Sequence, residues 1–137
     1  MNRIPFLAAF LWCLAIVAAP LLGLSAVYAF FSAICHQDPA RSWFIAGEPL
    51  PVCIRCASIY MGFLAALFAG LEPSARWLRA AILIAITEFV IARLFLDSAI
   101  TRSLSGILLG ATAAPFVNQG VLELLELLRR RKVRESV

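Results

Sequence analysis

The sequence predicts an all-α integral membrane protein: a bundle of four membrane-spanning helices followed by a basic juxtamembrane helix. The chain has 137 residues, of which 63% are hydrophobic and 15% are charged. An average soluble domain is about 45–50% apolar and about 25% charged, and small domains bury only part of their surface. A water-soluble globule of this composition would expose too much apolar surface, and the same composition excludes a disordered chain.

The first expected span covers residues 4–34, which carry no charge. A bilayer core requires about 20 helical residues, so this stretch is long enough to cross, and Pro20 and Gly23 are expected to kink it. A signal peptide is the competing interpretation, because Arg3 precedes the run and small residues occupy positions 25–29. The apolar run continues beyond that point, which favours a retained helix.

The second and fourth expected spans, residues 53–71 and 103–120, each carry a stripe of small side chains. The stripes consist of Ser58, Gly62, Ala66 and Gly70 in one span, and Gly106, Gly110 and Ala114 in the other. Small residues at every fourth position let two membrane helices approach closely. We therefore expect both spans to pack tightly against neighbouring helices.

The third expected span, residues 80–96, contains ionisable residues. Glu88 lies near its middle, Arg93 lies further along, and Asp97 follows four residues after Arg93, a spacing that allows the two to pair. A charge within a span is costly and indicates a functional group or a buried partner. For Glu88, a proton- or cation-carrying role and a hydrogen bond to a neighbouring helix both remain open.

Charge predicts the topology of the single domain, residues 1–137. A basic, leucine-rich tail at 121–137 has no aromatic residue within its basic run, which favours a topology signal over nucleic-acid binding. Eight Lys and Arg residues are expected on the side of the termini and four on the other. The eight are Arg3, Arg76, Arg79, Arg129, Arg130, Arg131, Lys132 and Arg134, and the four are Arg41, Arg55, Arg93 and Arg102. We therefore expect cytoplasmic termini, with the loops 35–52 and 97–102 facing outward.

The residues with the most distinctive chemistry lie between positions 35 and 56. Three of the four cysteines and the single histidine are there: Cys35, His36, Cys53 and Cys56. A short loop joins the first two spans, so these side chains are expected to lie close together. Thiolate and imidazole bind zinc tetrahedrally at about 2.0–2.3 Å, and a CxxC pair is a usual half-site. The sequence therefore predicts a zinc-type site, with iron as the second choice, that is structural or shapes a docking surface.

Polar neighbours are expected to orient these ligands and to balance their charge. They are Gln37, Arg41, Ser42 and Arg55. Arg41 and Arg55 are expected to lower the pKa of the thiols. Cys13 lies deep in the first span and is expected to act as a small hydrophobic residue.

Other interpretations of the same residues remain open. Cys53 and Cys56 could form a redox disulfide, with Cys35 as a resolving partner and quinone as electron acceptor, as in DsbB and vitamin K epoxide reductase. Enzymes of the DsbB kind use a second cysteine pair in the later external loop, and residues 97–102 contain none. A structural disulfide is a further alternative. Apart from the lipid bilayer, the expected partner is another membrane protein, with this chain as its accessory subunit, or a second copy of this chain.

One motif resembles a known family. Its residues are C-H-Q at 35–37, R-S at 41–42, Gly47, P-V-C-I-R-C at 51–56, Tyr60 and G-F at 62–63. The motif is similar to a family of small prokaryotic membrane proteins known as domain of unknown function two thousand and eighty-five. That family commonly has a pair such as Thr-Gly after the second cysteine, where this chain has Ala57-Ser58. The resemblance implies a multi-span protein of the prokaryotic cytoplasmic (inner) membrane, built around the Cys, His and Arg cluster.

Overall fold

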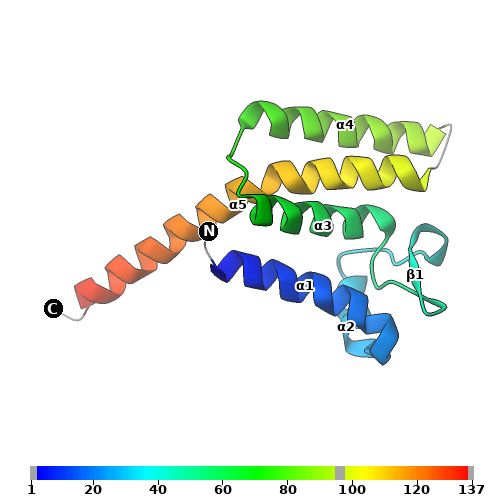
Figure 1. Cartoon of the computed structure of the whole chain (residues 1–137), viewed down its shortest axis with the longest axis horizontal. Helices are drawn as coiled ribbons and strands as arrows, with labels where there is room; N and C mark the ends of the chain where they lie inside the picture. Colours follow the sequence, from blue (N-terminus) through cyan, green and yellow to red (C-terminus); the bar gives the residue numbers. More distant parts are fainter. Residues whose placement is uncertain (1–2, 95–97, 136–137) are drawn as a thin grey trace.

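The computed structural model describes residues 3–94 and 98–135, and these residues are mostly helical (Figure 1). The helices are α1 (Arg3–Leu22), α2 (Ser25–Ser32), α3 (Ile54–Ala69), α4 (Ala75–Leu94) and α5 (Ala99–Glu135). Between α2 and α3 lie a 3-10 turn and a two-stranded hairpin: η1 (Pro39–Arg41), β1 (Phe44–Ile45) and β2 (Glu48–Pro49). The two strands are antiparallel, with Phe44 opposite Pro49 and Ile45 opposite Glu48.

The predicted bundle of four membrane-spanning helices is wrong. Among the described residues, two helices are long and apolar enough to cross a membrane, at Ile4–Leu22 and Ala99–Arg131. Helix α3 has 16 residues and extends for about 24 Å, short of the roughly 30 Å of a hydrocarbon core. Helix α4 has 20 residues but carries four charged side chains, which a lipid environment disfavours.

The expected first segment also differs from the structure. The stretch 4–34 is divided at Gly23, whose φ of +62° ends the first helix and separates α1 from the short α2. The tail predicted as a basic juxtamembrane helix is helical, and it continues from the preceding segment, because α5 runs without a break for 37 residues. Pro115 lies inside this helix and does not end it.

The hairpin was missed by the all-α prediction. Its two turn residues, Ala46 and Gly47, have φ values of +54° and +87°. Paired positive φ values are typical of two-residue hairpin turns, which are usually signalled by Asn-Gly or Asp-Gly. Alanine at the first position removes that signal, so the sequence reads as an ordinary loop.

Helices α3 and α5 pack along the two predicted stripes of small residues, which confirms that part of the sequence analysis. A Cβ atom added at Gly110 would lie 2.0 Å from the carbonyl oxygen of Ile59, and one added at Gly62 would lie 2.3 Å from that of Ile107. Only glycine leaves room for backbones this close. Gly70 is the exception in its stripe, because it ends α3 in a left-handed conformation.

The order of the helices places the cysteine-rich loop at one end of the molecule. Helix α5 lies between α3 and α4, and α1 lies on the other side of α3 (Figure 1). Helix α1 runs towards the hairpin and α5 runs back from it, so both termini are at the opposite end. The loop is anchored by Leu50 and Val52, which are buried in a cluster with Ile16 of α1 and Phe31 of α2.

Candidate metal centre

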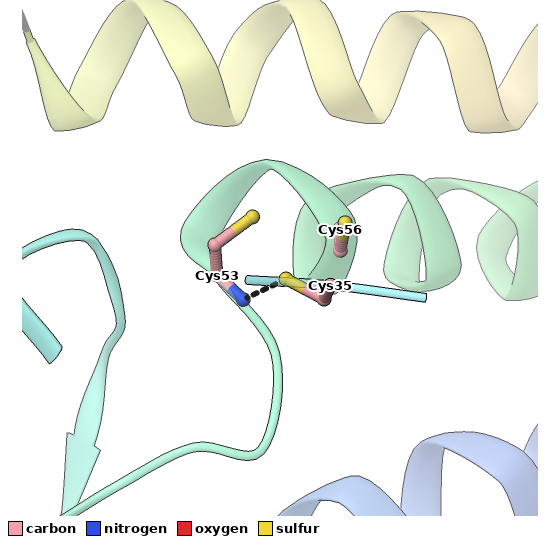
Figure 2. A group of neighbouring side chains, drawn as sticks. All are labelled: Cys35, Cys53 and Cys56. Carbon is pink, nitrogen blue, oxygen red and sulfur yellow. Dashed lines mark hydrogen bonds between the residues drawn. The ribbon is translucent and has the colours of Figure 1, made fainter. Parts of the chain in front are cut away.

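Three cysteines come together at the start of α3. The sulfur atoms of Cys35, Cys53 and Cys56 all lie within 4.8 Å of one another (Figure 2). Cys35 follows α2, Cys53 is the N-cap of α3, and Cys56 lies in its first turn. All three are free thiols, and Cys35 is buried. Tetrahedral zinc with Zn–S bonds of about 2.3 Å holds its sulfur ligands about 3.8 Å apart. The three sulfur atoms would therefore need to move only slightly closer together to bind zinc.

Hydrogen bonds hold the two cysteine-bearing segments together. The backbone N–H of Cys53 donates to Sγ of Cys35 at 3.2 Å (Figure 2). The side-chain amide of Gln37 donates to the carbonyl oxygens of Tyr28 and Pro51, at 2.7 and 2.9 Å. Gln37 thus ties the end of α2 to the segment that leads into Cys53, across 14 residues of sequence.

The turn between these segments is stabilised by Asp38 and Ser42. The Asp38 carboxylate accepts a hydrogen bond from the backbone N–H of Ala40 at 3.0 Å, and so caps η1. The buried hydroxyl of Ser42 donates to the Asp38 carbonyl oxygen at 2.9 Å. Ser42 therefore stabilises the turn. Its predicted role, to orient the metal ligands, stays a prediction.

The cluster favours one thiolate. The neighbouring thiol of Cys56 is the largest cause that lowers the pKa of Cys53 from 9.0 to about 5, and the backbone N–H groups of Cys56 and Arg55 add to it. Thiolate is the form of cysteine that binds metals. The expected cause was the guanidinium groups of Arg41 and Arg55; the structure assigns the main part to the neighbouring thiol.

The remaining predicted ligand, His36, and the two arginines are not among the three clustered side chains. His36 is exposed and outside the group of three sulfur atoms, so its role as a ligand stays a prediction. Arg41 forms an exposed ion pair with Asp38 at 3.5 Å. The guanidinium of Arg55 donates to the carboxylate of Glu88.

Glu88 connects three helices. Its Oε2 atom accepts hydrogen bonds from Arg55 of α3 and from the hydroxyl of Ser105 of α5, the latter at 3.3 Å. The Glu88 side chain is 10% exposed and that of Arg55 is 25% exposed. Arg55 also lies over the ring of Phe89, 5.3 Å from its centroid. The carboxylate thus has a partly buried cationic partner on a neighbouring helix.

The other predicted pair in α4 is only partly visible. Arg93 is exposed in the last turn of the helix, and Asp97 lies outside the described residues. Arg102 and Ser105 are buried near the start of α5 and were not predicted as site residues. Their spacing of three residues places them on one helix face, a signal that could have identified them as polar groups facing inward.

Replacing Glu88 with Gln is expected to lower the free energy of unfolding by about 1–3 kcal/mol, because the cation of Arg55 would lose its counter-charge. Breaking a fully buried pair costs about 3–5 kcal/mol, and the partial exposure of Arg55 reduces that figure. Denaturant titration in detergent micelles measures the change. Glu123→Gln, on an exposed part of α5, is the matched control. Equal stability of the two variants would contradict a structural role for the pair.

Comparison with known proteins gives a family and two partial relatives. A family model described as "Predicted membrane protein (DUF2085)" matches residues 35–116. An uncharacterized protein of Methanocaldococcus jannaschii is 55% identical over 38 residues, which are 28% of this chain and 24% of the relative. An uncharacterized protein of Methanothermobacter thermautotrophicus is 36% identical over 64 residues, 44% of this chain and 58% of the relative. The chain thus aligns with about a quarter of one relative and somewhat over half of the other. No solved structure shows a significant match.

Proposed function

Since the chain belongs to the DUF2085 family of predicted membrane proteins, as the motif indicated, we propose that it is a bilayer-associated protein holding one zinc-type metal ion. The ligands are the thiolates of Cys35, Cys53 and Cys56. The observation that carries the proposal is the convergence of three sulfur atoms within 4.8 Å from two segments of the chain. Thiolate-rich sets select zinc or iron over the harder cations magnesium and calcium.

The fourth ligand decides the role of the site. His36 adjoins Cys35 in sequence and would complete a closed Cys₃His set, which is typical of structural zinc. A water molecule in its place would leave an open position, which is typical of catalytic zinc. We favour the structural role, in which the ion fastens the loop 36–52 to the start of α3 and holds the hairpin in shape for a membrane-protein partner.

The proposed location follows from charge and the path of the helices. Both termini lie at the end of the molecule opposite the hairpin. The tail contains the basic residues 129–132 and Arg134, which favour the cytoplasmic side of a membrane. We place the termini on the cytoplasmic side of a prokaryotic inner membrane and the thiol cluster at its outer face.

Metal content tests the proposal directly. Protein purified in mild detergent, under anaerobic reducing conditions and without chelator, is expected to contain about one zinc or iron per chain. Cys35→Ser and Cys56→Ser are expected to lose most of it, because each removes one of three thiolates. Cys13→Ser keeps the cluster intact and serves as the matched control, since Cys13 lies in α1. Plasma mass spectrometry gives the stoichiometry, and circular dichroism shows whether each variant is folded.

Two further outcomes separate the alternatives. If His36 is the fourth ligand, His36→Ala should weaken zinc binding by more than the roughly 10- to 100-fold that loss of an outer-shell partner causes, whereas a water ligand predicts no change in a competition titration. Wild-type protein with far less than one metal ion per chain would overturn the metal site. A reducible Cys53–Cys56 disulfide in protein purified without reductant, together with thiol-dependent reduction of quinone, would support the oxidoreductase instead.

A further inference from the structure

Four arginine side chains line one small cavity beside the thiol cluster. Arg41, Arg55, Arg93 and Arg102 line this space of about 80 Å³, together with Cys53 and Phe89. The arginines come from four different elements: η1, the start of α3, the last turn of α4 and the first turns of α5. The packing of α3, α4 and α5 thus gathers guanidinium groups that are far apart in sequence.

The charged side chains that line this cavity are all arginines. Among the described residues that line it, none carries a carboxylate. Two acidic residues outside the lining, Asp38 and Glu88, form ion pairs with Arg41 and Arg55. Arg102 is only 8% exposed, so its charge acts where solvent screens poorly. A group of like charges around an enclosed space attracts an anion.

We propose that the cavity binds the phosphate group of a ligand, or a sulfate-like oxyanion of the same shape. Guanidinium groups present pairs of N–H donors whose spacing matches the oxygen atoms of such anions. The cavity is several times larger than the roughly 10–15 Å³ that one water requires, and it has room for a single tetrahedral anion. The ring of Phe89 covers Arg55 and limits the directions in which that guanidinium can turn.

Phosphate could reach the cavity as a free ion or as the headgroup of an anionic lipid. The cavity lies at the hairpin end of the molecule. The two candidate spans, Ile4–Leu22 and Ala99–Arg131, each have one end on this side. Lipid headgroups gather at the ends of membrane spans, and basic pockets between helices bind them. Both sources share the chemistry that the four arginines recognise. The proposal rests on these arginines and does not require the metal ion.

Calorimetric titration of the full chain with inorganic phosphate tests the site. In an uncharged detergent at constant ionic strength, we expect saturable binding that chloride does not reproduce. Arg93→Gln should weaken binding about tenfold, because Arg93 is exposed and its loss removes one guanidinium without disturbing the core. Arg79→Gln, the same substitution at the other end of α4, is the control and should bind as the wild type does.

The source of the phosphate is settled by a second titration with short-chain phosphatidylglycerol, using phosphatidylcholine as the neutral comparison. Binding of phosphatidylglycerol that depends on Arg93 and displaces inorganic phosphate assigns the cavity to a lipid headgroup. Phosphate binding that phosphatidylglycerol does not affect assigns it to the free ion. The proposal is overturned if phosphate acts no more strongly than chloride, or if Arg93→Gln binds like the wild type. The metal content of Arg93→Gln should equal that of the wild type. The anion site and the metal site are therefore tested independently of each other.

Discussion

Gly110→Ala is expected to force α5 away from α3 and to lower the free energy of unfolding by about 2–4 kcal/mol. The added Cβ would lie 2.0 Å from the carbonyl oxygen of Ile59 and 2.9 Å from the backbone nitrogen of Phe63. Both atoms belong to the backbone of α3, so no side-chain rotation can relieve the clash. Denaturant titration in detergent micelles, followed by circular dichroism, measures the loss.

Gly120→Ala is the matched control, because it makes the same change in the same helix. A Cβ at Gly120 meets nothing within 4 Å. Alanine favours a helix over glycine by about 0.5–1 kcal/mol, so this variant is expected to be at least as stable as the wild type. The two substitutions should therefore have opposite signs. A stability loss of similar size in both would mean that α3 and α5 do not pack along their glycines.

The close packing of α3 and α5 could be predicted from the sequence because it depends on a local pattern. Small residues recur every fourth position in both segments, and any partner helix must use that face. The number of membrane-crossing helices could not be predicted in the same way. It depends on where each helix ends and on how many charges it carries, and α3 proved too short and α4 too charged.

The thiol cluster was also largely predictable, since three of its residues flank one short loop and two of them share a helical turn. The partner of Arg55 was not. Glu88 lies 33 residues further along the chain, and the two meet only because α3, α4 and α5 pack side by side. The arginine-lined cavity depends on the same arrangement. Long-range packing of this kind leaves no periodic signal in a single sequence.

Removing the metal is expected to loosen one region of the molecule and leave the rest protected. The proposed ion joins Cys35 to Cys53 and Cys56, and so closes the loop 36–52 at its base. Without it, the loop is held by side-chain hydrogen bonds of Gln37 and Tyr28 and by the backbone hydrogen bond to Sγ of Cys35. The burial of Leu50 and Val52 adds to these contacts. Structural zinc contributes about 10–16 kcal/mol of apparent binding free energy in small zinc domains, so a substantial loss is expected.

Hydrogen exchange after treatment with a chelator measures this loss by region. Peptides covering residues 36–52 should exchange at least about tenfold faster, and the melting temperature should fall by on the order of 10 °C. Peptides of the α3–α5 interface should stay protected, because the contacts of Gly62 and Gly110 do not involve the thiols. The chelator should not change the hydrogen exchange of Cys56→Ser, since that variant has no ion to lose. Faster exchange along the whole chain would mean that the ion stabilises the entire fold, and unchanged exchange in the loop would contradict the proposed site.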